Sequence, residues 1–159
     1  MRLAVISDTH LESPTPWFER VFHRYLEGVD VLIHCGDVTG VDVIDWLRAV
    51  HPDVRAVSGN MCEYRVSCDL PPMLRTEAGG WKIGVTHGWG PRSQVPRKVY
   101  EAFGEGVDLI CFGHTHQFTW VRMGDTWLLN PGSLRRDGGS MALVEEEGGQ
   151  LRARHVVPD

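Results

Sequence analysis

Residues 107–116 read VDLICFGHTH, an apolar run followed by a glycine and by two histidines at positions i and i+2. An apolar run of this length predicts a buried strand. Two imidazoles at the end of such a strand can face one small volume, and neutral imidazole is the commonest protein ligand of transition metals. His114 and His116 alone are weak evidence, because many such pairs lie in solvated loops.

Four other apolar runs also finish on residues that can ligate metals. Asp8 and His10 follow the run at 3–7, Asp37 follows 31–36, Asn60 follows 54–59 and His87 follows 81–86. Each motif alone has a simpler interpretation as a turn, a cap or a structural histidine. Five strand ends of the same kind instead predict a metal centre along one edge of a sheet.

The number and type of these side chains indicate more than one ion. Seven candidate ligands exceed what one ion accepts, and carboxylate, amide and imidazole together suit Mn²⁺, Fe or Zn²⁺ better than a thiolate-bound structural zinc. Two ions about 3.5–4 Å apart, bridged by one carboxylate, would use all seven. Such a pair deprotonates a bridging water and neutralises charge on a phosphoryl oxygen.

The periodicity predicts an α/β fold in one domain over residues 1–159. Strands are expected at 3–7, 31–35, 53–57 and 107–112, helices at 16–27, 41–50 and 92–103, and a hairpin at 75–78 and 81–86. Residues 61–80 are otherwise irregular, and 117–123, 126–130, 140–145 and 150–156 are predicted to be antiparallel strands. We expect a four-layer αββα sandwich of two mixed β-sheets flanked by helices.

Charge and cysteine content narrow the functional class. A net charge of −5 argues against a nucleic-acid-binding surface. Four cysteines without a Cys-x-x-Cys pair predict free thiols in a reducing compartment, and with no signal peptide or apolar membrane span we expect a cytoplasmic protein. The basic groups 92–98 and 135–136 could meet a small anionic substrate, although solvated faces are the simpler interpretation of each group alone.

Several motifs resemble, in order, those of the calcineurin-like metallophosphoesterases. They are Asp8-Thr9-His10, Gly36-Asp37, Gly59-Asn60, His87 and Gly113-His114-Thr115-His116. The stretches at 86–88 and 130–133 resemble the small single-domain bacterial and archaeal phosphodiesterase branch.

The resemblance implies two metal sites. Asp8, His10, Asp37 and His116 would hold the first ion, whereas Asp37 (bridging), Asn60, His87 and His114 would hold the second. Asp37, Asn60, His87 and His114 are accordingly the predicted catalytic residues. Mn²⁺ is the expected metal, with Fe, Zn²⁺, Ni²⁺ or Mg²⁺ as alternatives. His34, inside a strand, is assigned to packing or to a hydrogen bond behind the ligands.

One position departs from the family pattern. Many members carry a histidine after the asparagine, which contacts the substrate and protonates the leaving group, but here that residue is Met61, followed by Cys62. A thioether cannot donate a proton. Small members of the branch also lack this histidine, so we expect the metals to carry most of the catalysis. Met61, Asn130 and Ser133 are candidates for substrate contact, although a rigid turn is the simpler interpretation of 130–133.

The predicted function is hydrolysis of a small phosphodiester by a bridging hydroxide on a dinuclear metal centre, without nucleic acid or membrane as partner. The first alternative is a phosphomonoesterase, including a protein phosphatase, with the same metals. The second is a non-catalytic scaffold like the metallophosphoesterase-like subunit of retromer, which we rank lower because all seven ligand positions are filled. A sequence-general nuclease is disfavoured by the acidic charge. A homo-oligomer is possible, with the helical aromatics as its contact, although core packing is their default role.

Overall fold

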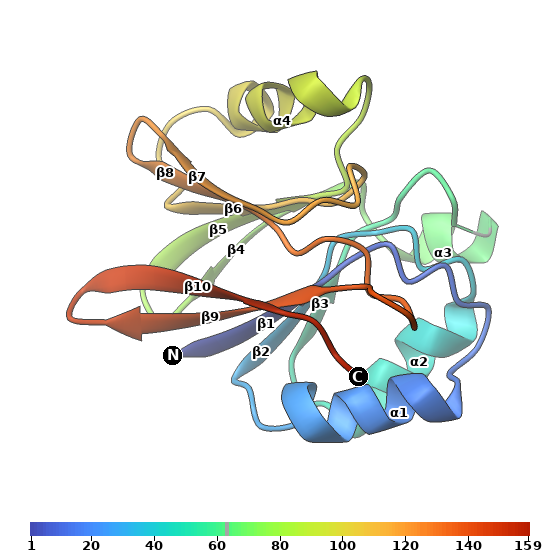
Figure 1. Cartoon of the computed structure of the whole chain (residues 1–159). Helices are drawn as coiled ribbons and strands as arrows, with labels where there is room; N and C mark the ends of the chain where they lie inside the picture. The colour runs from blue at the N-terminus through green and yellow to red at the C-terminus, as the bar shows by residue number, and fades with distance from the viewer. Residues whose placement is uncertain (63) are drawn as a thin grey trace.

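The computed structural model describes residues 1–62 and 64–159, without the side chains of Val66 and Cys68. It consists of two five-stranded sheets packed face to face with helices on the outer faces (Figure 1). The expected four-layer αββα sandwich of two mixed sheets is confirmed.

The first sheet has the order β10-β9-β1-β2-β3. Its strands are β1 (Arg2–Ile6), β2 (Val31–His34), β3 (Val54–Ala56), β9 (Met141–Glu147) and β10 (Gln150–Val156). β1 pairs in parallel with β2, as β2 does with β3, whereas β9 and β10 run antiparallel to their neighbours. The carboxyl ends of β1, β2 and β3 therefore meet at one edge.

The second sheet has the order β4-β5-β6-β8-β7. Its strands are β4 (Met73–Ala78), β5 (Trp81–Thr86), β6 (Leu109–Cys111), β7 (Thr119–Met123) and β8 (Thr126–Asn130). The predicted hairpin is confirmed: β4 and β5 pair antiparallel across Gly79 and Gly80, whose φ angles of 57° and 83° match a turn that needs two left-handed residues. β5, β6 and β8 run parallel in the centre of the sheet.

Helices cover the outer face of each sheet (Figure 1). α1 (Pro16–Val21), which continues into the π-helical turn η1 (Phe22–Leu26), and α2 (Val41–Val50) pack on the first sheet. α4 (Val95–Phe103), which follows the exposed 3₁₀ turn η2 (Arg92–Gln94), packs on the second. The short helix α3 (Tyr64–Asp69) lies in the connection from β3 to β4.

The hydrophobic pattern explains this layering. Ala4 and Ile6 of β1 face the helices, whereas Leu3 and Val5 alternate with them and face the second sheet. Phe18 and Phe22 are fully buried beneath the first sheet, so core packing accounts for these aromatics. In the described part of the chain, no helix has the length and apolar character needed to cross a membrane.

Three sequence expectations need correction. The helix expected at 16–27 changes to π-helical winding after Val21, where the N–H of Glu27 donates to the carbonyl of Phe22 over 3.0 Å. Residues 61–80, expected to be irregular outside the hairpin, contain α3. The tail is not wholly antiparallel, since β8 pairs in parallel with β6 and the tail strands divide between the two sheets.

Candidate metal centre

All seven predicted ligands lie just beyond the carboxyl ends of strands. Asp8 and His10 follow β1, Asp37 follows β2 and Asn60 follows β3, whereas His87 follows β5, and His114 and His116 follow β6. The expectation of one edge of one sheet is therefore corrected, because the first sheet supplies four residues and the second supplies three. The candidate centre lies where the edges of the two sheets meet.

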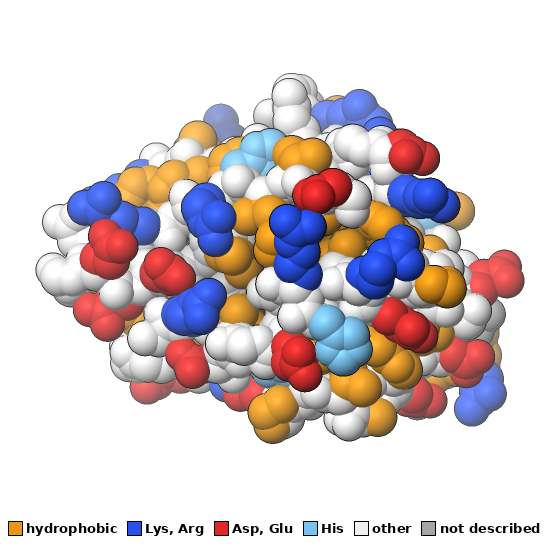
Figure 2. Space-filling model, turned by 60° about the horizontal axis from the view of Figure 1, so that its bottom comes forward, with side chains coloured by type: hydrophobic (Ala, Val, Ile, Leu, Met, Phe, Trp, Pro, Cys, Tyr) orange, Lys and Arg blue, Asp and Glu red, His pale blue; other side chains and the backbone are white. Residues whose placement is uncertain are grey.

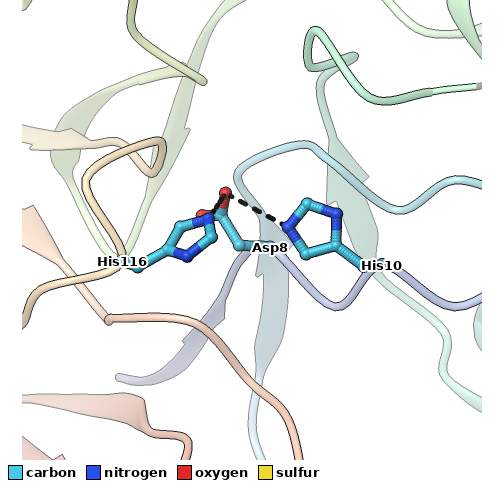
Figure 3. Close-up of side chains that lie close together, drawn as sticks. All are labelled: Asp8, His10 and His116. Carbon is cyan, nitrogen blue, oxygen red and sulfur yellow. Dashed lines mark ion pairs between the residues drawn. The ribbon is translucent and has the colours of Figure 1, made fainter. Parts of the chain in front are cut away.

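The first group of ligand atoms surrounds the carboxylate of Asp8, which Figure 3 shows between the imidazoles of His10 and His116. Oδ1 of Asp8 lies 3.0 Å from Nε2 of His116 and 4.0 Å from Nε2 of His10. One ligand atom from each residue lies within 4.8 Å of the others. These three side chains could hold a divalent ion.

The second group consists of Asp8, Asp37 and His87, all buried. Nε2 of His87 lies 3.3 Å from Oδ2 of Asp37 and 3.8 Å from Oδ1 of Asp8. The same Oδ2 of Asp37 lies 4.0 Å from Nε2 of His10. The carboxylates of Asp8 and Asp37 therefore each lie within 4.0 Å of an imidazole nitrogen from both groups.

Two atoms in these groups identify the volume that a cation would fill. Among the described residues, Oδ1 of Asp8 and Nε2 of His87 are the buried side-chain atoms without a hydrogen-bond partner. Burial of unpaired polar atoms is unfavourable, so each such atom needs an explanation. Because these two atoms lie 3.8 Å apart and belong to metal-ligating groups, a bound cation would satisfy both.

The remaining atoms of the same side chains are fixed by protein donors and acceptors. Oδ2 of Asp8 accepts from Oγ of Ser7 over 2.6 Å and from the N–H of His114 over 3.1 Å. Nδ1 of His87 donates to the carbonyl of Cys35 over 2.8 Å. Each side chain is therefore oriented through one atom and turns its other atom towards the neighbouring candidate ligands.

Asp37 is oriented in the same way, since its Oδ1 accepts from the N–H of Met61 over 2.7 Å while its Oδ2 faces Nε2 of His87. Burial would raise the pKa of Asp37, but the charge of His87, whose Nε2 lies 3.3 Å from Oδ2, together with the Met61 N–H, leaves the pKa below its ordinary value. Burial would lower the pKa of His87, but the close carboxylate of Asp37 and the charge of Asp8 leave the pKa raised. In the metal-free protein the ion pair of Asp37 and protonated His87 is thus favoured, and metal binding must release that proton.

This coupling predicts how the stability of the metal-free protein depends on pH. Because the folded-state pKa of His87 is raised above 6.5, its contribution is complete below that value and is lost as pH rises through the folded pKa. The contribution of Asp37 is present above 3.8 and is lost as pH falls through its lowered pKa. In EDTA, the urea midpoint should decline as pH rises above 6.5, and His87→Gln should abolish that decline. An unchanged alkaline decline in His87→Gln would contradict the assignment.

His114 and Asn60 lie beside these groups. The ring of His114 stands edge-on to that of His87, with centroids 5.3 Å apart, but its Nε2 donates to the carbonyl of Gly90 over 3.0 Å, so Nδ1 is the nitrogen left for a ligand. Asn60 is exposed and lines a cavity of about 350 Å³ together with His87 and Trp89. The structure therefore brings five predicted ligands close together and places the other two, His114 and Asn60, beside them. The five are Asp8, His10, Asp37, His87 and His116.

The backbone at the candidate ligands is unusual. Among the described residues, seven non-glycine residues have a positive φ, and five of them are predicted ligands. These five are Asp8 (53°), His10 (49°), Asp37 (55°), His114 (68°) and His116 (59°). Residues other than glycine adopt this region at a cost and cluster there at functional sites. The left-handed turns after β1, β2 and β6 direct the ligand side chains towards one volume.

His34 connects two of these turns from behind. Its Nδ1 accepts from the N–H of Gly36 over 3.1 Å, and its Nε2–H donates to Oγ1 of Thr9 over 3.1 Å. Burial, with a smaller effect from the charge of His87, lowers the pKa of His34 to about 3. A neutral imidazole therefore holds the turns of Asp8 and Asp37 together, in agreement with the expected hydrogen-bonding role.

Asn130 and Ser133 also lie behind the ligands. The buried Nδ2 of Asn130 donates to the carbonyl of Gly113 over 2.7 Å and to Oγ1 of Thr115 over 3.0 Å, and its Oδ1 accepts from the N–H of Gly132 over 2.9 Å. Oγ of Ser133 donates to the carbonyl of Asp8 over 2.8 Å. These bonds indicate that Asn130 and Ser133 position the turns that carry the candidate ligands. They do not favour the contact with substrate that the sequence suggested for these two residues. Met61, in contrast, is 57% exposed.

Asn130→Ala is expected to lower the free energy of unfolding by about 2–3 kcal/mol, because it leaves the buried carbonyl of Gly113 and Oγ1 of Thr115 without their donor. Urea unfolding measures this loss, and the metal affinity should fall with it because the turn that carries His114 and His116 loosens. The matched variant Asn60→Ala, at an exposed position, should leave the stability of the metal-free protein nearly unchanged. Equal stability losses in the two variants would contradict this role of Asn130.

Cys35 and Cys111 do not compete as ligands. Burial raises the pKa of the Cys35 and Cys111 thiols, so both remain neutral. Cys35, Cys62 and Cys111 are free cysteines, as predicted. The side chain of Cys68, the fourth predicted free thiol, lies outside the described residues.

Comparison with known proteins agrees with this geometry. Residues 1–149 match the model of the calcineurin-like phosphoesterase superfamily domain. The chain is 38% identical over 135 residues to a probable metallophosphoesterase of Methanocaldococcus jannaschii, covering 84% of this chain and 68% of the relative. It is 27% identical over 148 residues to a phosphodiesterase of the same organism, covering 83% of each.

Two further matches extend the comparison to a solved structure and to a sorting protein. A conserved predicted phosphoesterase from Streptococcus pneumoniae superposes with a TM-score of 0.77 at 28% identity, covering 98% of this chain and 88% of that one. The vacuolar protein sorting-associated protein 29 of Schizosaccharomyces pombe is 27% identical over 154 residues, covering 92% of this chain and 79% of the relative.

Proposed function

The chain belongs to the calcineurin-like phosphoesterase superfamily, and from this premise we propose that it is a metal-dependent phosphodiesterase that acts on a small phosphorylated substrate. The observation that carries the proposal is the pair of unpartnered atoms, Oδ1 of Asp8 and Nε2 of His87, buried 3.8 Å apart between the two sheets. A site that keeps such atoms free is suited to a cation rather than to protein stability alone.

We assign two divalent ions to this centre. Asp8, His10, Asp37 and His116 would hold one, whereas Asp37, Asn60, His87 and His114 would hold the other. In support, Oδ2 of Asp37 lies within 4.0 Å of nitrogens from both sets. Mn²⁺ is the metal we expect, because carboxylate, amide and imidazole ligands suit it.

The ions, when bound, supply Lewis-acid activation of water and neutralisation of phosphoryl charge. The residues of the chain contribute orientation. Ser7 and the His114 N–H fix the carboxylate of Asp8, the Met61 N–H fixes that of Asp37, and the Cys35 carbonyl fixes the ring of His87. Rigid groups of this kind need no reorganisation during the reaction.

The cavity beside Asn60 and His87 supports a diester over a monoester. Its described lining includes Pro72, Met73 and the 43%-exposed Trp89, but no Lys or Arg. A phosphodiester carries one charge less than a monoester dianion and adds a second organic group. An apolar wall without extra cations fits that organic group.

Two chromogenic substrates test this proposal. With Mn²⁺, kcat/KM for bis(p-nitrophenyl) phosphate should exceed that for p-nitrophenyl phosphate, and EDTA should abolish both activities. The reverse preference would assign the centre to a phosphomonoesterase.

The similarity to vacuolar protein sorting-associated protein 29 favours a second candidate, a non-catalytic scaffold. The two candidates differ in metal-dependent turnover. Purified protein that retains no transition metal and gives no Mn²⁺-dependent hydrolysis of either ester would support the scaffold.

Met61→His should accelerate esters with poor leaving groups about tenfold or more and change p-nitrophenyl esters little, because only poor leaving groups need a proton in the transition state. Met61 is exposed and its N–H bonds Asp37, so a histidine there can reach the site without repacking the core. The slope of log kcat against leaving-group pKa measures the effect, with Met61→Leu as the control. An equal change for both kinds of ester would contradict a proton-donating role at this position.

We also propose a reducing, cytoplasmic compartment. Support comes from the three free cysteines, two of which are buried.

A further inference from the structure

A second cavity, of about 410 Å³, begins at the turn that carries the first two ligands. Thr9, between Asp8 and His10, is part of its lining, and Leu11, Trp17 and Leu134 provide apolar walls. Its lining includes the two neighbours of His10 in the chain, Thr9 and Leu11, whereas the cavity with Trp89 is lined by the predicted ligands Asn60 and His87 themselves. The turn after β1 therefore borders the second cavity.

Three arginines make the lining of this second cavity positively charged. Arg20, Arg135 and Arg136 line it, no acidic residue does so among the described residues, and no ion pair of the described chain includes any of the three. We call it the arginine cavity. Figure 2 shows the face on which α1 lies, where Lys and Arg side chains are interspersed with acidic and hydrophobic ones. An adjoining hollow adds Asp137 and Asp159, and Asp159 pairs with Arg24 over 3.0 Å.

These three exposed arginines line one apolar hollow although the chain has a net charge of −5. Guanidinium groups bind phosphate oxygens through two parallel hydrogen bonds, which makes them the usual side chains for phosphate recognition. The apolar walls suit an organic group next to that phosphate.

The arginine segment is attached to the ligand turn. The N–H of Leu134 donates to the carbonyl of Ser7 over 2.9 Å, and Oγ of Ser133 donates to the carbonyl of Asp8 over 2.8 Å. The backbone that carries Arg135 and Arg136 is therefore fixed relative to Asp8. A group held by these arginines would keep a constant distance from the candidate centre.

We propose that the arginine cavity binds the second arm of the substrate, and that this arm carries a further phosphate group. The proposal rests on the phosphodiesterase function above and narrows its substrate class. The scissile phosphodiester lies at the metal centre, the leaving group lies in the cavity with Trp89, and the phosphorylated organic arm lies against Trp17 with its phosphate on Arg20, Arg135 and Arg136.

A matched pair of chromogenic diesters tests this assignment. Thymidine 3′-(p-nitrophenyl phosphate) and its 5′-phosphorylated form share the same scissile bond and leaving group and differ in the distal phosphate. The wild-type enzyme should prefer the 5′-phosphorylated substrate by about tenfold or more in kcat/KM. Arg135→Ala, Arg136→Ala and Arg20→Ala should each reduce this preference, whereas hydrolysis of bis(p-nitrophenyl) phosphate should stay unchanged.

Arg48→Ala is the matched control, because Arg48 is an exposed arginine on α2 that lines neither cavity. It should leave the preference as in the wild type. Calorimetric binding of thymidine 3′,5′-bisphosphate gives a readout without turnover, and Arg135→Ala should weaken it about tenfold while Arg48→Ala should not.

These measurements separate failure of the site from failure of the proposed function. Two results would contradict phosphate binding in the arginine cavity without contradicting the phosphodiesterase function. One is hydrolysis of both nucleotides at equal kcat/KM, and the other is a preference that persists in all three arginine variants. Absence of any turnover would count against the phosphodiesterase. Arginine-dependent binding of the bisphosphate would then still support the cavity as a phosphate site, and binding independent of the arginines would overturn it.

Discussion

Asp8→Asn is expected to lower kcat for bis(p-nitrophenyl) phosphate by at least about 10³-fold, with loss of most bound metal. Oδ2 of Asp8 accepts two hydrogen bonds, from Ser7 and from the His114 N–H, so the carbonyl oxygen of an asparagine would take that place. The NH₂ group would then replace Oδ1, and an amide nitrogen with two N–H bonds cannot ligate a cation. Oδ1 would ligate the first ion and also lies 3.8 Å from Nε2 of His87, a ligand of the second, so both sites should be affected.

The substitution keeps the size and the existing hydrogen bonds of the side chain, so the fold should remain. Circular dichroism and metal content measured together distinguish loss of the ion from loss of structure. Asp45→Asn, at an exposed position of α2, provides the same chemical change away from the site and should leave activity unaltered. Asp8→Asn with full metal content and activity near the wild-type value would refute the assignment of Asp8.

Gly59→Ala is expected to weaken metal binding by about a hundredfold or more and to reduce activity in parallel. A methyl group at position 59 would collide with Oδ1 and the backbone N of Asp37, and would lie 3.0 Å from its carboxylate carbon. The backbone cannot yield as a flexible side chain does, so the turn after β2 must shift and take the carboxylate of Asp37 with it. Equilibrium dialysis against Mn²⁺ measures the loss.

Gly28→Ala is the control for this prediction. A methyl group at position 28 would have no atom within 4 Å, and that position has no left-handed backbone, so activity should stay the same. Stability should rise by about 0.4–1 kcal/mol, because alanine restricts the unfolded chain. If Gly59→Ala binds Mn²⁺ as tightly as Gly28→Ala, the close approach between Gly59 and Asp37 has no role in metal binding.

The elements that the sequence predicts well are those whose periodicity is local. Val95, Val99 and Phe103 repeat at helical spacing and form the buried face of α4, and the glycine pair at 79–80 fixes the β4–β5 hairpin. The parallel pairing of β8 with β6 was not predicted, because it depends on contacts between segments distant in the chain. The π-helical winding after Val21 has no signature in a hydrophobic pattern.

The candidate site likewise has residues that the sequence predicts and residues that it does not. Residues that follow strand ends, such as Asp8, Asp37 and His87, can be found from the sequence because parallel strands present their carboxyl ends together. The residues that orient these ligands cannot be found in this way. Ser133, for example, donates to the carbonyl of Asp8 although the two are 125 residues apart in the sequence. Of the residues that line the arginine cavity, the adjacent pair 135–136 is a candidate anion contact from the sequence. Nothing in the sequence links Arg20, which lies on α1, to that pair.

The bonds around Asp8 have a consequence for biosynthesis. Asp8 leaves the ribosome well before Ser133, yet its carbonyl accepts a hydrogen bond from Ser133, and β1, which leads to Asp8, pairs with β9 (Met141–Glu147). Contacts between such distant segments form late and slowly. The candidate metal centre therefore cannot take its final shape until residues 133–147 have left the ribosome, and a protein truncated before residue 141 should lack it.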